Sequence, residues 1–336
     1  MKHINVALFV PHEGCPQQCV FCNQRHISGK SRRLCAKDIE RAVNAAGIND
    51  KKSSDSKREI AFFGGSFTAI DRDYMVDLLQ AAQPYIADKR FTGIRISTRP
   101  DAVDAEICQL LKQYGVTAIE LGAQSMSDDV LAMNRRGHTA QDLVDASTLI
   151  KAYGFELGLQ MMTGLYGSSP QESITTARKI IACKPKTVRI YPTLVLGGTH
   201  LAQLTATGEY RPQTVEEAVP LCAKLLKMFF DEGIDVIRLG LHSGAGVEEG
   251  YIAGPYHPAF RELCDAAIYL ENARPALQAK LPAGGPATLL VAKTALSQMI
   301  GHKRANLAVL AAEGYPCKVT PCEGQAKYQV TVVANE

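Results

Sequence analysis

The sequence predicts an α/β fold in which a parallel sheet curls into a partial (β/α)6 barrel and is followed by a small C-terminal α+β domain. Apolar strand patterns and amphipathic helix patterns alternate six times, which is typical of right-handed βαβ units. Loops rich in cysteine, glycine and polar residues follow the strands, at the edge where parallel sheets bind ligands. Glycine- and proline-rich connectors interrupt this order after about residue 244. We therefore expect domains over residues 1–243 and 250–336.

Short apolar runs mark the strands, and apolar residues three or four positions apart mark the helices. The strands are expected at residues 5–10, 59–63, 93–97, 117–121, 155–161, 187–191 and 235–239. The helices are expected at residues 37–46, 73–87, 102–114, 141–153, 170–183 and 214–231. Gly115 and Gly154 suit helix C-caps, Pro170 suits a first turn, and Thr214 with Glu217 forms a capping box. Six units are too few to close an eight-fold barrel, so the sheet is expected to stay open.

The C-terminal region has a mixed pattern. We expect helices at residues 260–270 and 303–312, a strand at 289–291, and a hairpin formed by residues 317–321 and 328–333. Lys303 and Arg304 open the second of these helices and could contact phosphate, although a solvated helix face is the simpler interpretation. Cys317 and Cys322 have no histidine nearby, which favours free thiols over a metal site.

Composition is that of an ordinary globular protein, with 46% hydrophobic and 21% charged residues. A net charge of only +3 gives no global basic field that would by itself indicate nucleic-acid binding. No apolar segment approaches the length of a membrane span, so no membrane partner is expected. Ten cysteines without a secretion signal indicate a reducing compartment, so we predict a cytoplasmic protein.

Three cysteines in the first loop, Cys15, Cys19 and Cys22, have the spacing C-x3-C-x2-C, with Phe21 just before the last. Soft thiolates select iron–sulfur clusters or zinc over metals that prefer oxygen. A four-iron cluster usually takes four cysteines, so three leave one iron open for a small molecule. A structural zinc held with His12 or His26, or a chance grouping, are the alternatives.

This loop, with an aromatic residue inside it, resembles the signature of the radical S-adenosylmethionine (SAM) enzymes. Residues 99–137, the run MMTGLYGS and the run RIYPTLVLGGTHL extend the likeness to the radical SAM domain of the Elongator catalytic subunit, without its acetyltransferase domain. Oxygen-independent coproporphyrinogen III oxidases are more distantly similar. The resemblance covers about two-thirds of the chain and implies the partial barrel of the radical SAM type.

The resemblance implies a [4Fe–4S] cluster held by Cys15, Cys19 and Cys22, with SAM on the open iron. It also implies SAM contacts at the following positions: Gly64, Gly65 and Ser66 in place of a Gly-Gly-Glu-like motif, Ser97 where relatives carry Glu, Gln124, Arg136, and Tyr191 and Val195 at the adenine pocket. A tight βα turn, a surface arginine and a packed barrel mouth are the ordinary structural alternatives for these residues.

The function implied is reductive cleavage of SAM to a 5'-deoxyadenosyl radical that acts on tRNA or another RNA. An electron donor such as flavodoxin or ferredoxin is implied with it. Two alternatives stay open: a porphyrinogen-modifying radical enzyme, and a non-catalytic regulatory protein that binds the cluster and SAM. The second is allowed because Ser66 and Ser97 replace acidic residues.

Overall fold

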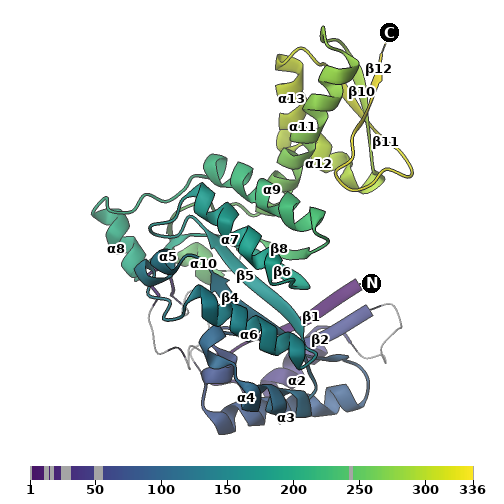
Figure 1. Cartoon of the computed structure of the whole chain (residues 1–336). Coiled ribbons are helices and arrows are strands. Elements are labelled where there is room, and N and C mark those ends of the chain that lie inside the picture. Colours follow the sequence, from purple (N-terminus) through teal and green to yellow (C-terminus); the bar gives the residue numbers. More distant parts are fainter. Residues whose placement is uncertain are drawn as a thin grey trace. The chain divides into compact units, whose positions relative to one another are not determined.

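The computed structural model of the chain describes residues 2–10, 15, 19–23, 32–48, 56–241 and 245–335. The chain divides into two compact units, which are described separately (Figure 1). The first comprises Met1–Gln213 and Glu232–Gly254, and the second comprises Thr214–Asp231 and Pro255–Glu336. Helix α9 (Val215–Asp231) groups with the second unit, while the domain limits of 1–243 and 250–336 remain a prediction.

A seven-stranded parallel sheet, curled into a half-barrel as predicted, forms the centre of the first unit (Figure 1). Its strands are β1 (Lys2–Phe9), β2 (Ser56–Phe63), β3 (Gly93–Thr98), β4 (Val116–Gln124), β5 (Glu156–Thr163), β6 (Thr187–Pro192) and β8 (Asp235–Leu239). Each strand pairs with its successor in this order, as consecutive βαβ units require. Strand β7 (Val195–Leu196) lies outside the sheet and pairs antiparallel with β9 (Tyr251–Ala253).

Helices connect successive strands and cover one face of this sheet. They are α2 (Ala36–Ala45), α3 (Arg72–Ala87), α4 (Ala105–Gln113), α6 (Ala140–Ala152) and α7 (Pro170–Ala182), while α5 (Asp128–Met133), α8 (His200–Ala206) and α10 (Ala245–Gly250) are short helices in the segments after β4, β7 and β8. Side chains of Asp71, Asp104, Thr139 and Ser169 cap the first turns of α3, α4, α6 and α7. Pro170 occupies the first turn of α7, as predicted.

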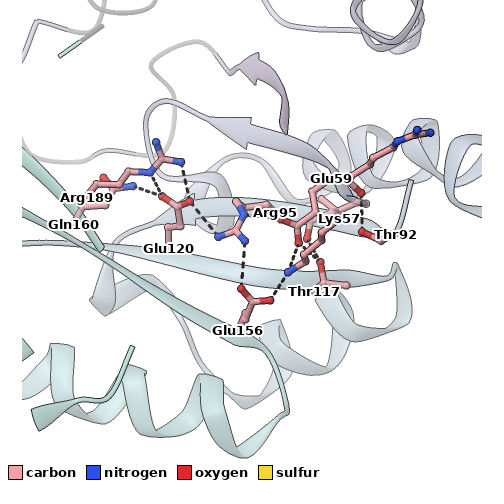
Figure 2. Close-up of polar contacts among 11 residues, drawn as sticks. Lys57, Glu59, Thr92, Arg95, Thr117, Glu120, Glu156, Gln160 and Arg189 are labelled. Atoms are coloured by element: carbon pink, nitrogen blue, oxygen red, sulfur yellow. Dashed lines mark hydrogen bonds and ion pairs between the residues drawn. The ribbon is translucent and has the colours of Figure 1, made fainter. Parts of the chain in front are cut away.

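The two faces of the sheet differ in chemistry, because side chains alternate along each strand. The face against the helices is apolar and fully buried; it carries Ile60, Phe62, Ile94, Ile96, Ile119, Leu121, Val188 and Ile190. The opposite, concave face carries charged residues from five neighbouring strands, β2 to β6 (Figure 2). The sheet therefore has one face that supplies the core and another that is available for chemistry.

Salt bridges fill the base of the concave face (Figure 2). The fully buried Arg95 lies 2.8 Å from a carboxylate oxygen of Glu59 and 3.3 Å from one of Glu120. Arg189 donates to both oxygens of Glu120, at 2.6 and 3.0 Å. Lys57 and Glu156 extend the network, which thus holds three cations and three carboxylates. Such matched charge lets ionised groups be buried without an unpaired member.

The second unit places three helices beside a three-stranded sheet (Figure 1). Besides α9, its helices are α11 (Phe260–Lys280), α12 (Leu296–Ile300) and α13 (Ala305–Ala312), and its strands are β10 (Ala287–Val291), β11 (Cys317–Pro321) and β12 (Thr331–Ala334). The predicted hairpin is wrong: β11 and β12 flank β10 on opposite sides, β11 parallel and β12 antiparallel to it. Among the described residues, no helix is both long and apolar enough to cross a membrane.

Candidate functional site

The loops at the carboxyl edge of the sheet form the candidate site. Since the strands are parallel, the segments after β1, β2, β3, β4 and β6 leave the sheet at the same edge. These segments contain the cysteines, the Gly64-Gly65-Ser66 turn, Arg99, Gln124 and Thr193. The predicted functional residues are thus brought to one end of the half-barrel by the topology itself.

Two separate segments of the first unit anchor the described portion of the cysteine loop through three hydrogen bonds. The backbone N–H of Val20 donates to the carbonyl of Asn134 at 3.3 Å, and the carbonyl of Val20 accepts from the N–H of Leu201 at 2.8 Å. The side-chain amide of Asn23 donates to the carbonyl of Gly197 at 2.7 Å. The loop is therefore held by the segments after β4 and β6, although it follows β1.

The aromatic residue of the motif has a packing role. Phe21 lies against a buried apolar cluster made by Val195, Leu201, Leu204 and Tyr210. Between the last two cysteines the chain makes a tight turn, in which the N–H of Cys22 donates to the carbonyl of Cys19 at 3.0 Å. A small polar residue in place of Phe21 would leave the loop without this apolar contact.

Arg136 links the cysteine loop to the sheet. Its Nη1 donates to the Sγ of Cys19 at 3.2 Å, and its Nη2 donates to the carbonyl of Gly122 at 2.7 Å. The Nε atom is buried and has no hydrogen-bond partner in the described part of the chain. The alternative of an ordinary surface arginine is therefore wrong for Arg136, which is only 8% exposed. A buried guanidinium with a spare donor is suited to bind a carboxylate.

Positive charge surrounds the first cysteine. Burial raises the pKa of the Cys15 thiol above its usual value, and the cations Arg99 and Arg136 oppose this rise. Arg99 also hydrogen-bonds to the Cys15 sulfur, and Asp101 holds the arginine by contacts of 2.6 and 2.9 Å. Because a thiolate is the form that binds metal, the two arginines offset part of the effect by which burial disfavours that form at Cys15.

The Gly64-Gly65-Ser66 turn is shaped by its backbone. Both glycines have positive φ, of 88° and 54°. A Cβ on Gly64 would lie 2.7 Å from the carbonyl oxygen of Val10, so a side chain there would displace the end of β1. Ser66 is fully buried; its Oγ lies 2.8 Å from Oγ1 of Thr98 and accepts from the N–H of Arg99. Any ligand contact here would thus come from the backbone.

Gln124 ends β4 in a strained conformation beside Arg136. Its φ is 64°, in the left-handed region that non-glycine residues rarely adopt, and the pairing of β4 with β5 shifts register at this point. A Cβ on Gly122 would lie 2.9 Å from Nε2 of Gln124 and 3.3 Å from Nη2 of Arg136. The two side chains therefore share the space above Gly122. The buried Oε1 of Gln124 has no partner among the described residues.

The remaining predicted SAM contacts have more ordinary surroundings. Ser97 is half-buried and lies beside Glu120 in the register of β3 with β4. Tyr191 hydrogen-bonds to Arg189, and burial raises the pKa of its phenol. Val195 is fully buried in the apolar cluster described above, as the packing interpretation requires. Roles for these three residues toward a cofactor remain predictions.

Sequence reasoning gave Arg99 and His138 no role toward the cysteine loop, whereas it placed Thr193 with Tyr191 and Val195 at the predicted adenine pocket. Arg99 faces Cys15, and the nearly buried Thr193 has an Oγ1 without a partner in the described segments. Burial, with Arg136 as the second cause, lowers the pKa of His138 to about 4. The only signal for Arg99 was its place after a strand, and nothing in the sequence marks His138.

The donor groups fit the predicted cluster and SAM. Three thiols from one loop provide soft ligands, and the orphaned atoms of Gln124, Arg136 and Thr193 provide polar partners at the same edge. Over the described ranges, no three His, Cys, Asp or Glu side chains already converge as a metal-ligand set. Residues 16–18 and the alternative zinc ligands His12 and His26 lie outside the described residues.

Comparisons with known proteins agree with this geometry. A "tRNA uridine(34) acetyltransferase" of Dehalococcoides mccartyi is 28% identical over 240 residues, which are 62% of this chain and 52% of that protein. The protein of that name from Methanocaldococcus jannaschii is 34% identical over 187 residues, 49% of this chain and 34% of its own. Human Elongator complex protein 3 is 31% identical over 192 residues, 51% and 35% of the two chains. The chain thus spans about half the length, or less, of these curated relatives.

Among solved structures, the archaeal Elp3 of Methanocaldococcus infernus with an N-terminal deletion superposes with a TM-score of 0.61. The match has 20% identity and covers 81% of this chain and 63% of that one, which supports the fold. The sequence profile of the Radical SAM C-terminal domain matches residues 185–271, and that of the Radical SAM superfamily matches residues 9–180. The chain therefore belongs to the Radical SAM superfamily.

Proposed function

We propose that this chain binds a [4Fe–4S] cluster through Cys15, Cys19 and Cys22, cleaves SAM reductively, and acts on tRNA or another RNA. The family as a whole uses this cluster and SAM. When bound and reduced by an electron donor, the cluster would supply one electron to SAM, whose C5'–S bond would break to give methionine and a 5'-deoxyadenosyl radical able to take a hydrogen atom from substrate.

The contact between Arg136 and Cys19 is the observation that carries this proposal. It brings a cation with a spare Nε donor to the thiol that is to hold iron. Gln124 lies beside that cation over Gly122, where its free Oε1 can accept a hydrogen bond. We assign Arg136 to the carboxylate of SAM and Gln124 to its amino or ribose groups. The Gly64–Gly65 turn offers backbone groups to the same ligand.

The other site residues prepare the edge for this ligand. Arg99 and Arg136 oppose the rise in the pKa of Cys15 that burial causes, so their charges reduce the cost of forming the thiolate that binds iron. Phe21, Asn134 and Leu201 fix the loop in place before any ligand binds. Such preorganisation reduces the ordering cost of binding.

An RNA substrate is supported by the names of the relatives alone. Three of them are named tRNA uridine(34) acetyltransferase. An electron donor such as flavodoxin or ferredoxin and a cytoplasmic location belong to the same proposal. All ten cysteines are free thiols, as a reducing compartment requires.

Anaerobic reconstitution tests the cluster and the cleavage together. We expect about four iron atoms per chain and release of 5'-deoxyadenosine after reduction with SAM present. Cys19→Ala should lose both. Cys35→Ala is the matched control, because Cys35 is an exposed thiol outside the loop and should leave both unchanged. Iron and SAM binding without 5'-deoxyadenosine would instead support a non-catalytic regulatory protein.

Isotope transfer tests the substrate. With tRNA labelled with deuterium on its nucleosides, hydrogen abstraction should place deuterium in 5'-deoxyadenosine, which mass spectrometry detects. Unlabelled tRNA is the control. If a deuterated porphyrinogen transferred label and tRNA did not, the RNA assignment would be wrong and the alternative substrate correct.

A further inference from the structure

The segment Gly301–Arg304 in the second unit is a basic loop that the proposed SAM chemistry does not use. His302, Lys303 and Arg304 are all exposed. Throughout the described ranges, neither Lys303 nor Arg304 forms an ion pair with a carboxylate, whereas Arg274 of the same unit pairs with Glu313 at 2.7 Å. The loop therefore presents two cations that no described carboxylate pairs with.

The backbone of this loop is unusual. Gly301 has φ 80° and ψ 160°, a conformation that only glycine adopts readily. Lys303 and Arg304 follow with φ of 50° and 64°, so two successive long side chains are in the left-handed region. Helix α13 accordingly begins at Ala305, and the predicted start at Lys303 is wrong. Strained backbone of this kind persists when its surroundings hold it, often at binding sites.

The side chain of Asn306 holds the loop in place through hydrogen bonds. Its Nδ2 donates to the carbonyls of Ala266, Met299 and Gln298, at 2.9, 3.1 and 3.3 Å. A Cβ on Gly301 would lie 2.8 Å from the backbone nitrogen of Asn306, so only glycine fits there. The loop is thus tied to α11 and α12, and the side chains of Lys303 and Arg304 are exposed.

The surrounding topology is that of a known class of nucleic-acid module. Strand β10, helix α12, the loop, helix α13 and strand β11 follow one another, and β10 and β11 pair in parallel in a three-stranded sheet. Helices α11, α12 and α13 lie beside this sheet (Figure 1). KH modules hold four nucleotides of backbone with a G-x-x-G loop between two helices. Here Gly301 corresponds to the first glycine of that motif. Arg304 stands where the motif has its second glycine, and it also has a positive φ.

We propose that the Gly301–Arg304 loop binds the sugar–phosphate backbone of single-stranded RNA. The likeness to KH modules is one of arrangement, and the charge and conformation of the loop are what support binding. Lys303 and Arg304 would contact phosphates, with Arg304 offering a fork to two oxygens. The choice of RNA over DNA rests on the proposed function. The proposal that this loop binds a sugar–phosphate backbone does not depend on that function. The profile of the C-terminal domain ends at residue 271, before this loop.

Binding of a single-stranded RNA of about 12 nucleotides, three times the length a KH loop holds, tests the proposal. Fluorescence anisotropy is measured with the full-length, cluster-loaded protein without SAM or reductant, over a range of KCl concentrations. Lys303→Asn with Arg304→Asn removes both charges and keeps residues that accept positive φ. We expect affinity to fall tenfold or more, and the slope of log affinity against log salt to decrease by about 1.4, for two lost phosphate contacts.

Lys280→Asn with Lys318→Asn is the matched control. It makes the same change in charge at two exposed lysines. Lys280 ends α11, roughly 30 Å along the helix from Phe260, whereas the ring of His302 makes an edge-to-face contact with His257, just before that helix begins. The control should keep affinity within about twofold. An equal loss in both double variants would mean that only net charge matters, and would overturn the proposal.

Cross-linking of the wild-type protein to 4-thiouridine RNA gives a second measurement that needs no variant. We expect cross-linked peptides from residues 293–306. Cross-links confined to other regions, a preference for duplex RNA, or tighter binding to single-stranded DNA would each contradict the proposal. Because SAM is absent, failure to form 5'-deoxyadenosine and failure to bind RNA are separate results.

Discussion

The guanidinium of Arg136 donates a hydrogen bond to the Sγ of Cys19 across 117 positions of sequence, at 3.2 Å. The same side chain holds the carbonyl of Gly122 at 2.7 Å. One residue thus sets the distance between the cysteine loop after β1 and the end of β4. Both proposed cofactors would contact this arginine, so its removal should affect cluster and SAM together.

Replacing Arg136 by Gln removes the charge and both hydrogen bonds. Hydrogen bonds to charged groups contribute about 1.5–3 kcal/mol, so we expect SAM to bind about 10- to 100-fold more weakly. The measurement is 5'-deoxyadenosine formation as a function of SAM concentration. Arg135→Gln is the control, because Arg135 is the exposed neighbour and undergoes the same chemical change. Equal effects of the two substitutions would remove Arg136 from the site.

Gly122→Ala tests the shared space of Gln124 and Arg136. The new Cβ would lie 2.9 Å from Nε2 of Gln124, so both side chains must move. They are flexible at these atoms, and the strand conformation of Gly122 suits alanine; we therefore expect a change of less than about 1 kcal/mol in the free energy of unfolding. SAM affinity should nevertheless fall by tenfold or more. Urea unfolding and SAM titration of the same preparation measure the two effects. A large loss of stability with normal SAM affinity would contradict this assignment.

Much of the fold could be predicted because its signals are local. Apolar periodicity located the strands and helices, and the capping box of Thr214 and Glu217 is present, with contacts of 2.9 and 3.3 Å. The hairpin in the C-terminal region failed for a physical reason. Alternation of residues 317–321 and 328–333 shows that they are strands, but it does not show that both pair with the distant β10.

Only the part of the site that sequence motifs mark could be predicted. The cysteines could be recognised from their spacing, and the other residues from their places at the ends of predicted strands. The burial of Arg136 depends on tertiary structure, which the sequence alone does not reveal. The pairing of Arg95 with Glu59 and Glu120 was not foreseen either, since those residues lie on three different strands. Likewise, no glycine or proline at residues 303–304 signals the left-handed backbone that delays α13.

Glu120→Gln should destabilise the first unit. Glu120 is 1% exposed and pairs with both Arg95 and Arg189. Its carboxylate raises the pKa of Arg189 above the usual value even though burial acts in the opposite direction. The substitution leaves three cations against two carboxylates, and breaking a buried pair costs about 3–5 kcal/mol. Urea unfolding measures this loss.

Glu106→Gln is the control for that substitution. Glu106 pairs with Arg72 at 2.7 Å, but its side chain is 79% exposed. Exposed pairs contribute about 0–1 kcal/mol, so this variant should unfold near the wild-type denaturant concentration. Similar losses in the two variants would show that the network in the concave face is not specially stabilising.

The buried His138 should make stability fall in mild acid. Burial first and Arg136 second lower its pKa to about 4, although Asp101 opposes the shift. The unfolded chain takes up the proton near pH 6.5, which the folded chain resists until about pH 4. Stability from this group is therefore complete above about pH 6.5 and declines as pH falls toward 4. At pH 5 the loss amounts to about 2 kcal/mol.

His138→Asn should remove this part of the difference in unfolding free energy between pH 7.5 and pH 5. His200→Asn, on the exposed side of α8, should retain it. The same pH dependence in wild type and His138→Asn would show that another group is responsible.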